Sequence, residues 1–375
     1  MPSPSSPPII LITGASGMLG RALHRLLRSC STDDGAAAYI VIGTAYSRLR
    51  VNHYHKYFPL PKNDSHNSSA ADTPSSSVEL HRLDLLDNDA TAAFIQKHRP
   101  DIIVHCAAQR YPDAFESNLT ESIQLNVNST RHLAQLCVSQ SDYKPHLIYI
   151  STSYVFDGGI ESKDYPPYFP TSIANPINNY GKSKWEGECA IRDVMNAANN
   201  NHEGRGIIVR VPLLYGEDCI KLEESPALEM MKVLLPKAEG GSIEKKNIDD
   251  WALRFPTSCE DVAKVLKLFI DRIINDKHFS GTYHVSSPAG TTKYGLLQLQ
   301  SELLNISKTC LDKRAARQAE NPSSINPSAA PRPQCTQLSC EETWTALGCQ
   351  FEFVALENGM ARSLNGFPER FVSNH

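Results

Sequence analysis

The segment Tyr180–Lys184 places a tyrosine and a lysine four residues apart near the start of a predicted helix. At this spacing the two side chains project from one face of the helix. A free phenol has a pKa of about 10 and is a poor acid or base at neutral pH, whereas a neighbouring ammonium lowers that pKa. The pattern therefore predicts Tyr180 as a catalytic proton donor or acceptor that Lys184 tunes. The alternative is an ordinary exposed helix start, because this spacing is common by chance.

Hydroxyl groups follow the apolar run His146–Ile150, which is typical of a buried strand. Ser151, Thr152 and Ser153 come directly after it. In open α/β sheets, ligands bind at the carboxyl ends of the parallel strands. We therefore expect Thr152 to donate a hydrogen bond to the same substrate oxygen that Tyr180 serves.

Three glycines, Gly14, Gly17 and Gly20, lie between a predicted strand and a predicted helix in the stretch Thr13–Gly20. The first permits a tight turn, the second lets the backbone approach a pyrophosphate, and the third allows the helix to pack closely on the strand. The N–H groups and partial positive charge of the helix N-terminus favour phosphates. This arrangement predicts a dinucleotide-binding turn. The alternative is three turn glycines in a loop that binds nothing.

The second predicted strand ends at Tyr46, Ser47 and Arg48, where NAD-selective sites usually carry an acidic residue for the ribose hydroxyls. This chain has a hydroxyl and a cation there instead. Arg48 pairs well with a 2′-phosphate, to which Ser47 also donates. The sequence thus predicts NADP rather than NAD, with hydride transfer at the carbon beside the oxygen that Tyr180 serves. The alternative is that Arg48 and Arg50 merely open a solvated loop.

Apolar runs typical of strands alternate six times with segments of helical spacing, which is the pattern of a doubly wound parallel α/β sheet, the Rossmann fold. The predicted strands are Ile9–Thr13, Tyr39–Thr44, Val78–Leu83, Asp101–Ala107, His146–Ser151 and Gly206–Val211. The helices predicted among them are Met18–Arg28, Asn88–His98, Leu119–Ser139 and Asn179–Ala198.

The pattern changes after Gly216. Further helices are predicted over Leu222–Leu235, Ser258–Ile274, Lys293–Leu304 and Glu341–Leu347, and a strand over Thr282–Val285 that rejoins the main sheet. Two polar stretches, 52–77 and 315–333, are typical of insertions. We therefore predict a dinucleotide-binding domain of residues 1–213 and 250–287, and a smaller substrate-type lobe of residues 214–249 and 288–375 that ends in a tail.

Charge and composition exclude several classes of protein. The 375 residues carry 37 basic and 41 acidic side chains, a net charge of −4, which argues against a nucleic-acid partner. The apolar runs are far shorter than the ~20 residues of a membrane helix. None of the ten cysteines forms a C-x2-C pair, so no metal site is predicted. The start Met1–Pro8 lacks the form of a signal peptide, and we expect a cytoplasmic protein.

Several of these stretches resemble the extended short-chain dehydrogenase/reductase superfamily. The chain is most similar to the branch that holds dTDP-4-dehydrorhamnose reductases and the regulatory beta subunits of methionine adenosyltransferase. The shared stretches are Thr13–Gly20, Val104–Ala108, Tyr149–Gly158, Tyr180–Lys184 and Arg210–Gly216. The runs Lys221–Ser225 and Arg254–Thr257 resemble the regulatory subunits rather than the reductases.

The resemblance implies an NADP-binding, reductase-like subunit that associates with the catalytic subunit of methionine adenosyltransferase and modulates S-adenosylmethionine synthesis. The alternative is an NADPH-dependent reductase of a nucleotide-linked keto sugar, so whether the chain is an enzyme stays open. The resemblance also adds contacts to the cofactor beyond Thr13 and the glycines, namely Met18, Leu19, Asp84, Leu85, Cys106, Arg110 and Leu214. From the residues alone, Asp84 is equally explained as a helix cap and Cys106 as a small space-filling side chain.

Two further positions bear on the choice between subunit and enzyme. The branch usually has an aspartate before its Tyr-Val-Phe run, whereas this chain has Ser153, which weakens the enzyme interpretation. The chain ends in Phe371–His375, and the resemblance implies that such a tail engages the catalytic subunit. The alternative for the tail is a frayed end.

Overall fold

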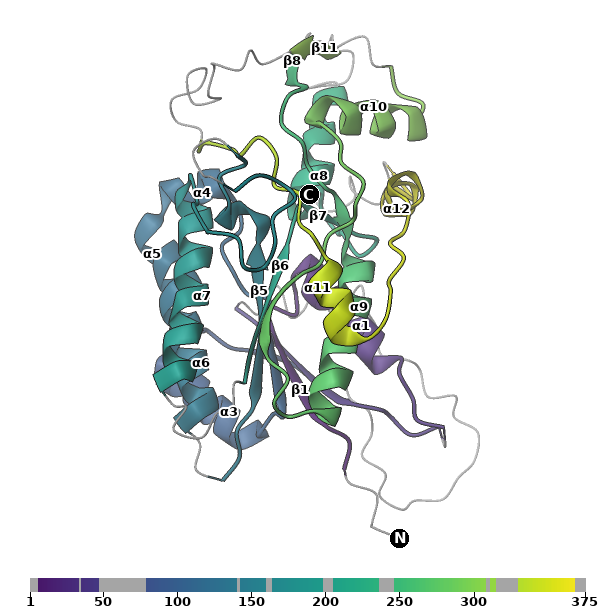
Figure 1. Cartoon of the computed structure of the whole chain (residues 1–375). Coiled ribbons are helices and arrows are strands. Elements are labelled where there is room, and N and C mark those ends of the chain that lie inside the picture. The colour runs from purple at the N-terminus through teal and green to yellow at the C-terminus, as the bar shows by residue number, and fades with distance from the viewer. Residues whose placement is uncertain are drawn as a thin grey trace.

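The computed structural model describes residues 6–33, 35–46, 79–139, 142–159, 164–197, 205–235, 246–307, 311–314 and 330–367. Seven parallel strands form one sheet in the order β10-β6-β5-β4-β1-β2-β3 (Figure 1). The strands are β1 (Ile9–Thr13), β2 (Ile40–Ala45), β3 (Glu79–Arg82), β4 (Ile102–His105), β5 (His146–Thr152), β6 (Gly206–Val211) and β10 (Gly281–His284). The predicted doubly wound sheet is confirmed, including the late strand that rejoins it beside β6.

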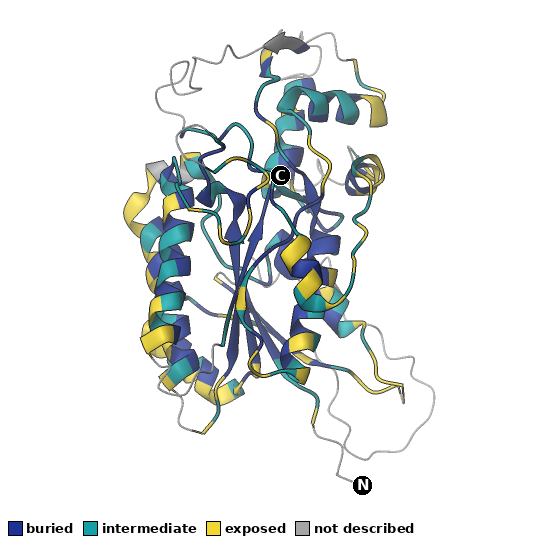
Figure 2. Ribbon diagram, viewed as in Figure 1, coloured by how far each residue is buried: buried dark blue, intermediate teal, exposed yellow. Residues whose placement is uncertain are grey.

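Helices cover both faces of this sheet (Figure 1). On one face lie α1 (Met18–Arg28), α9 (Cys259–Asn275) and α11 (Glu341–Leu347). On the other face lie α3 (Asn88–His98), α6 (Ser129–Ser139) and α7 (Asn179–Ala197). Side chains of β1 alternate between the two faces, as the pleat requires. Ile10 and Ile12 belong to the core shared with α1 and α9, whereas Leu11 packs with residues of α6 and α7. The strands between the two helical layers are largely buried (Figure 2).

One predicted helix is interrupted in the structure. The segment Leu119–Ser139 divides into α5 (Leu119–Ile123), a π-helical turn (Gln124–Asn128) and α6. A π turn inserts an extra residue and is frequent at functional sites. The short helix α4 (Pro112–Ser117), which precedes it, was not predicted.

The prediction of one helix over Leu222–Leu235 is also wrong. The segment consists of three short turns: a 3-10 turn (Leu222–Glu224), α8 (Pro226–Glu229) and a second 3-10 turn (Met230–Leu234). Pro226 has no N–H to donate to a preceding turn, and Ser225 stands in extended conformation as the N-cap of α8. The chain is therefore forced to restart rather than continue as one helix.

The remaining elements gather at one end of the sheet, near the carboxyl ends of its strands (Figure 1). They are β7 (Leu214–Tyr215) paired with β9 (Thr257–Ser258), β8 (Lys246–Asp249) paired with β11 (Leu311–Arg314), and the helices α10 (Lys293–Leu303) and α12 (Leu356–Ser363). The predicted division into two lobes stays a proposal. The stretch 52–77 and most of 315–333 lie outside the described residues.

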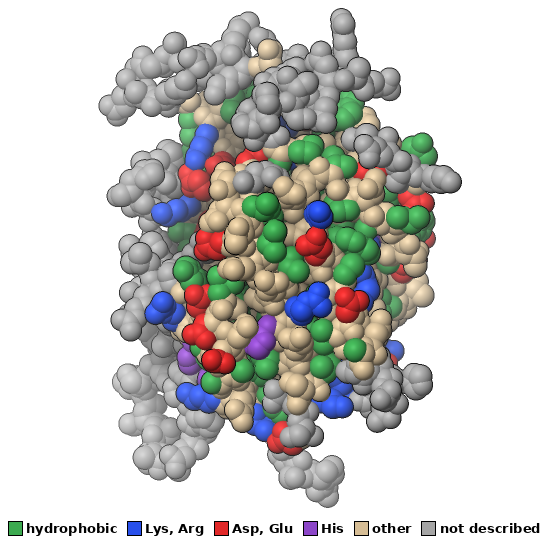
Figure 3. All heavy atoms as spheres, turned by 90° about the vertical axis from the view of Figure 1, so that its left-hand side faces the viewer, with side chains coloured by type: hydrophobic (Ala, Val, Ile, Leu, Met, Phe, Trp, Pro, Cys, Tyr) green, Lys and Arg blue, Asp and Glu red, His purple; other side chains and the backbone are tan. Residues whose placement is uncertain are grey.

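Charges of both signs are interspersed with apolar and polar side chains on the outer face of the layer that contains α7 (Figure 3). Within the described ranges, no helix is both long enough and apolar enough to cross a membrane. The same residues contain no group of three or more His, Cys, Asp or Glu side chains placed to hold a metal ion.

A fully buried ion pair joins α7 to the sheet. Arg210 on β6 donates from Nε to Glu188 Oε1 over 2.9 Å and from Nη2 to Oε2 over 2.7 Å. Ser151 Oγ at the end of β5 donates to the same carboxylate over 2.6 Å. The Arg210 guanidinium holds the pKa of Glu188 low in spite of its burial. His284 on β10 lies 3.4 Å from Arg210, and its burial lowers its pKa to about 3, so it stays neutral.

We expect Arg210→Met to destabilise the fold by roughly 3–5 kcal/mol, because it leaves the Glu188 carboxylate buried without its bidentate partner. Arg192 pairs with the same carboxylate from the rim, with its side chain one-third exposed, and Arg192→Met is the matched control with an expected cost below about 1 kcal/mol. Urea unfolding of both variants measures the difference. Equal losses in the two variants would contradict the structural importance assigned to the inner pair.

Candidate functional site

The glycine-rich turn joins β1 to α1 in the close-packed form that its sequence predicts. Gly14 has φ +68°, a left-handed conformation that favours glycine, and a Cβ there would lie 2.7 Å from Ala107 N. A Cβ on Gly20 would lie 2.7 Å from Ala15 Cα. Gly17 is the N-cap of α1 and offers no side chain to its first N–H groups. These groups therefore remain available to an anion such as a pyrophosphate.

The floor of the turn is apolar or neutral. Thr13 does not point outward, because its Oγ1 lies 2.7 Å from His105 Nδ1 at the end of β4. Burial lowers the pKa of His105 to about 3, so the ring is neutral. Met18 and Leu19 are buried in the core beside the turn. Cys106 has its thiol pKa raised to about 12 by burial, which favours the space-filling interpretation over a reactive thiolate.

Tyr180 and Thr152 come together as predicted. Tyr180 lies in the first turn of α7, Thr152 ends β5, and the Thr152 hydroxyl is close enough to affect the pKa of Tyr180. Burial raises the pKa of Tyr180 to about 12, against smaller lowering effects of the Thr152 hydrogen bond and of the Arg110 charge. The sequence predicts the opposite direction, because the spacing shows the ammonium of Lys184 but not the depth at which the phenol is buried. Tyr180 is thus held as a neutral phenol by the protein.

Lys184 is turned inward and is 2% exposed. Its Nζ lies 4.0 Å from the centre of the Tyr149 ring, a cation–π geometry. Burial lowers the pKa of Lys184 to about 7, and the nearby Glu188 carboxylate offsets only part of that effect. An anionic ligand beside Lys184 would favour its charged form. Tyr180 and Lys184 lie one turn apart on α7, and burial favours the neutral form of both groups, but Lys184 is directed toward Tyr149 and is not among the groups that shift the pKa of Tyr180.

Asn126 is a site residue that sequence reasoning missed. It lies in the π-helical turn, 1% exposed, and its side chain binds both the N–H and the carbonyl of Gln109 over 2.8 and 2.9 Å. Its Nδ2 also donates to Ser183 Oγ over 3.1 Å, and Ser183 in turn donates to the carbonyl of Tyr180 over 2.8 Å. Asn126 thus fixes the loop after β4 to the start of α7. The signal in the sequence was an asparagine between Leu125 and Val127 inside a predicted helix, although Asn128 shows that asparagine alone does not single out the position.

Only some of the contacts predicted at the adenosine end belong to the described residues. Tyr46 follows β2 and is 61% exposed. Ser47 and Arg48 lie outside the described residues. Asp84 accepts from Leu86 N over 3.0 Å and so closes the turn after β3, whereas the cap of α3 is Asp87.

Leu85, beside Asp84, is buried. Because Asp87 and not Asp84 caps α3, the helix-cap explanation for Asp84 is wrong.

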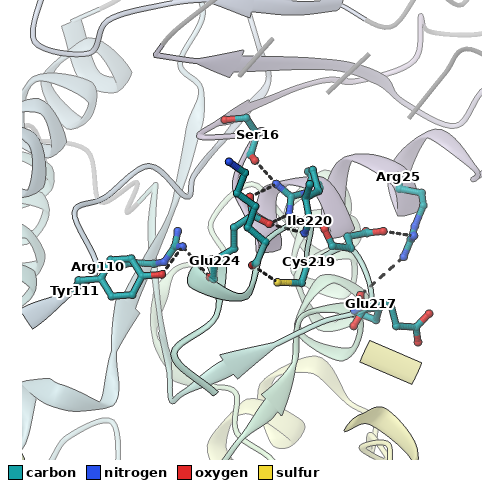
Figure 4. Close-up of polar contacts among 12 residues, drawn as sticks. Ser16, Arg25, Arg110, Tyr111, Glu217, Cys219, Ile220 and Glu224 are labelled. Atoms are coloured by element: carbon teal, nitrogen blue, oxygen red, sulfur yellow. Dashed lines mark hydrogen bonds and ion pairs between the residues drawn. The ribbon is translucent and has the colours of Figure 1, made fainter. Parts of the chain in front are cut away.

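Glu224, in the run Lys221–Ser225, contacts both α1 and the loop after β4 (Figure 4). Arg110, after β4, donates from Nη2 to the carbonyl of Glu224 over 2.7 Å. Its Nε is buried with no hydrogen-bond partner among the described residues. Leu214 is half-buried, and its carbonyl accepts from Ser225 Oγ over 2.9 Å. Arg110, in the loop after β4, and Leu214, at the start of β7, thus both contact the run Lys221–Ser225.

Ser153 is not free to contact a substrate. It is 1% exposed, and its Oγ accepts from Thr336 Oγ1 over 3.1 Å. The segment that carries Thr336 is also held by Asn178, whose Nδ2 donates to Pro331 O over 2.9 Å. Arg332 in this segment pairs with Asp113 of α4 over 3.0 Å. Ser153, which stands where the branch usually has an aspartate, therefore holds the segment of Thr336 against the end of β5.

Comparison with known proteins gives the family. The model of the RmlD substrate binding domain matches residues 9–365. The chain belongs to this family. It is 34% identical to "Methionine adenosyltransferase 2 subunit beta" of Xenopus tropicalis, over 88% of this chain and 80% of that protein. It is 27% identical to "dTDP-4-keto-6-deoxy-D-glucose reductase" of Streptomyces niveus, over 78% of each.

The solved structures agree on the fold. A dTDP-4-dehydrorhamnose reductase from Bacillus anthracis, solved in complex with NADP, superposes with a TM-score of 0.65. The match covers 96% of this chain and 99% of that one, at 21% identity. The two chains thus share the Rossmann sheet. The N–H groups at the start of α1, which no capping side chain occupies, and the buried Arg110 Nε, which has no hydrogen-bond partner among the described residues, are donors that fit an anionic dinucleotide.

The lowered pKa of Lys184 predicts how stability depends on pH. Between pH about 7 and 10.5 the unfolded chain holds a proton on Lys184 that the folded chain has lost, so the contribution of Lys184 to stability becomes more favourable as pH rises across this window. Lys184→Met removes that dependence. We expect it to be more stable than the unaltered protein near pH 6 and to lose this advantage toward pH 10. Chemical unfolding across this range tests the expectation, and Lys182→Met is the exposed control. Parallel pH profiles for the unaltered chain and Lys184→Met would refute it.

Proposed function

We propose that this chain is an NADP-binding, reductase-like regulatory subunit that associates with a catalytic methionine adenosyltransferase and modulates S-adenosylmethionine synthesis. The observation that carries the proposal is its similarity to beta subunits of methionine adenosyltransferase 2, at 31 to 34% identity over most of the chain. The run Lys221–Ser225 resembles these subunits, and its Glu224 accepts hydrogen bonds from Arg21 and Arg110. We place the protein in the cytoplasm.

The cofactor proposed is NADP. Support comes from the geometry of Gly14 and Gly20, from the N-terminus of α1, and from a neighbouring structure that holds NADP. Tyr46, Ser47 and Arg48 would receive the adenosine ribose and its 2′-phosphate. When bound, NADP supplies a hydride donor or acceptor, while Tyr180, Lys184 and Thr152 hold the oxygen at which a proton moves.

Arg48→Ala tests the choice between the two nucleotides. A hydrogen bond to a charged group contributes about 1.5–3 kcal/mol, so we expect the Kd for NADPH to rise about tenfold or more while the Kd for NADH changes little. Fluorescence titration measures both constants. Arg50→Ala is the matched control, and an unchanged NADPH affinity in Arg48→Ala would remove the assignment.

A reductase of a nucleotide-linked keto sugar is the second candidate. The specific observation in its favour is that Tyr180 lies in the first turn of α7 near Thr152 at the end of β5, with Lys184 one turn further along the same helix. The similarity to the Streptomyces niveus reductase adds to it, at a lower identity than that to the beta subunits. The engagement of Ser153 by Thr336 favours the regulatory candidate, because it leaves no carboxylate at that place.

Purified chain mixed with a methionine adenosyltransferase catalytic subunit from the same source separates the two candidates. We expect co-elution on size-exclusion chromatography and a changed rate of S-adenosylmethionine formation. We also expect no NADPH oxidation with a dTDP-4-keto sugar. We propose that residues 371–375 contribute to the contact, so deleting them should weaken co-elution. Robust sugar turnover without any association would reverse our order of the candidates.

A further inference from the structure

Glu224 connects three parts of the chain that are distant in sequence (Figure 4). Its two carboxylate oxygens accept from Nη1 and Nη2 of Arg21 over 3.0 and 2.6 Å, an end-on bidentate pair across 203 positions. Its Oε2 also accepts from Ile220 N over 2.8 Å, and its carbonyl accepts from Arg110. One residue of the smaller lobe therefore holds the helix after the glycine-rich turn and the loop after β4.

Arg21 transmits this contact to the turn itself. Its guanidinium is 2% exposed, and Nη1 donates to the carbonyl of Ser16, inside the glycine-rich turn. Nη2 also donates to the carbonyl of Asp218 over 2.6 Å. Fixing the Ser16 carbonyl fixes the peptide plane between Ser16 and Gly17, whose N–H donates to the carbonyl of Gly14 over 2.9 Å. This peptide directly precedes the N–H groups at the start of α1 that are available to a phosphate. Arg25, one turn further along α1, binds the Asp218 carboxylate.

We propose that Glu224 is a positioning residue for the dinucleotide: through Arg21 it sets the conformation of the phosphate-binding turn, so that dinucleotide affinity and the conformation of residues 217–225 are coupled. The inference rests on the proposed binding of NADP. The physical reason is that Arg21 is buried with its charge satisfied by Glu224, so that the turn keeps this conformation only while the segment 217–225 stays docked. Coupling of this kind is reciprocal: a partner that shifts the segment changes NADP affinity by the factor by which NADP changes partner affinity.

Glu224→Gln is the direct test, because glutamine keeps the shape of the side chain but places an NH2 group against an N–H donor of Arg21 or Ile220. Glu223→Gln is the matched control. It makes the same change of charge at the adjacent residue, whose half-exposed side chain pairs with Lys232 at the surface. We expect the Kd for NADPH to rise about tenfold in the first variant, within the range typical of coupled sites, and to stay unchanged in the second.

A ligand fragment separates positioning from general damage to the fold. Adenosine 2′-phosphate lacks the pyrophosphate, so its affinity should be the same in Glu224→Gln and in the unaltered chain. A double-mutant cycle with Arg21→Gln adds a second readout. If the two residues act through one contact, the double variant should bind NADPH no more weakly than the weaker single variant.

Hydrogen exchange on the unaltered chain gives a test that needs no variant. NADPH should slow amide exchange in residues 217–225, and exchange that NADPH leaves unchanged there would overturn the proposal. Equal NADPH affinity in Glu224→Gln and the unaltered chain would also overturn it, while the proposed function would stand. Absence of NADPH binding by the unaltered chain would overturn both, and that outcome is distinct because no variant is involved.

Discussion

The buried pair of Glu188 and Arg210 is the interaction on which the geometry of the site depends. Glu188 lies one helical turn after Lys184 on α7, Arg210 lies on β6, and Ser151 of β5 binds the same carboxylate. Neither charge can be left unpaired in this interior without a cost of several kcal/mol, so the depth and rotation of α7 on the sheet are set by one contact. Because Tyr180 and Lys184 lie on the same helix as Glu188, the Glu188–Arg210 contact also positions them. Arg210 extends the constraint through His284 to the segment after residue 338, whose Ser339 carbonyl lies 3.1 Å from the imidazole.

The burial that positions the Tyr180–Lys184 pair also sets its titration. Desolvation disfavours every charged form, so it raises the pKa of Tyr180 and lowers that of Lys184. The two groups would have to become charged together to act as the sequence pattern predicts. Glu188 offsets only part of this effect at Lys184, and an anionic ligand beside Lys184 would supply the rest of the compensating charge. Anion binding there would thus favour the charged form of Lys184.

Much of the fold could be predicted because it is local. The spacing of apolar residues placed α1, α3 and α11 with the observed bounds, and the glycine pattern identified the phosphate-binding turn. The failures have physical reasons that single-sequence periodicity does not express. The π-helical turn keeps a helical pattern while it shifts the face on which Asn126 lies. Pro226 outweighed an apolar periodicity that otherwise favoured a helix. The direction of the Tyr180 pKa depended on burial created by segments far away in the sequence.

The contacts between residues far apart in the sequence were the least predictable. Arg21 and Glu224 lie 203 positions apart, and Ser153 and Thr336 lie 183 apart, so no local pattern pairs them. Arg21 is buried and its partner Glu224 is a quarter exposed, while Ser153 and Thr336 are both buried. These contacts hold the segments of Glu224 and Thr336 against α1 and the end of β5. A ligand that favours such an arrangement stabilises it by its differential affinity, and a regulatory subunit can pass that stabilisation to a partner without turning over a substrate.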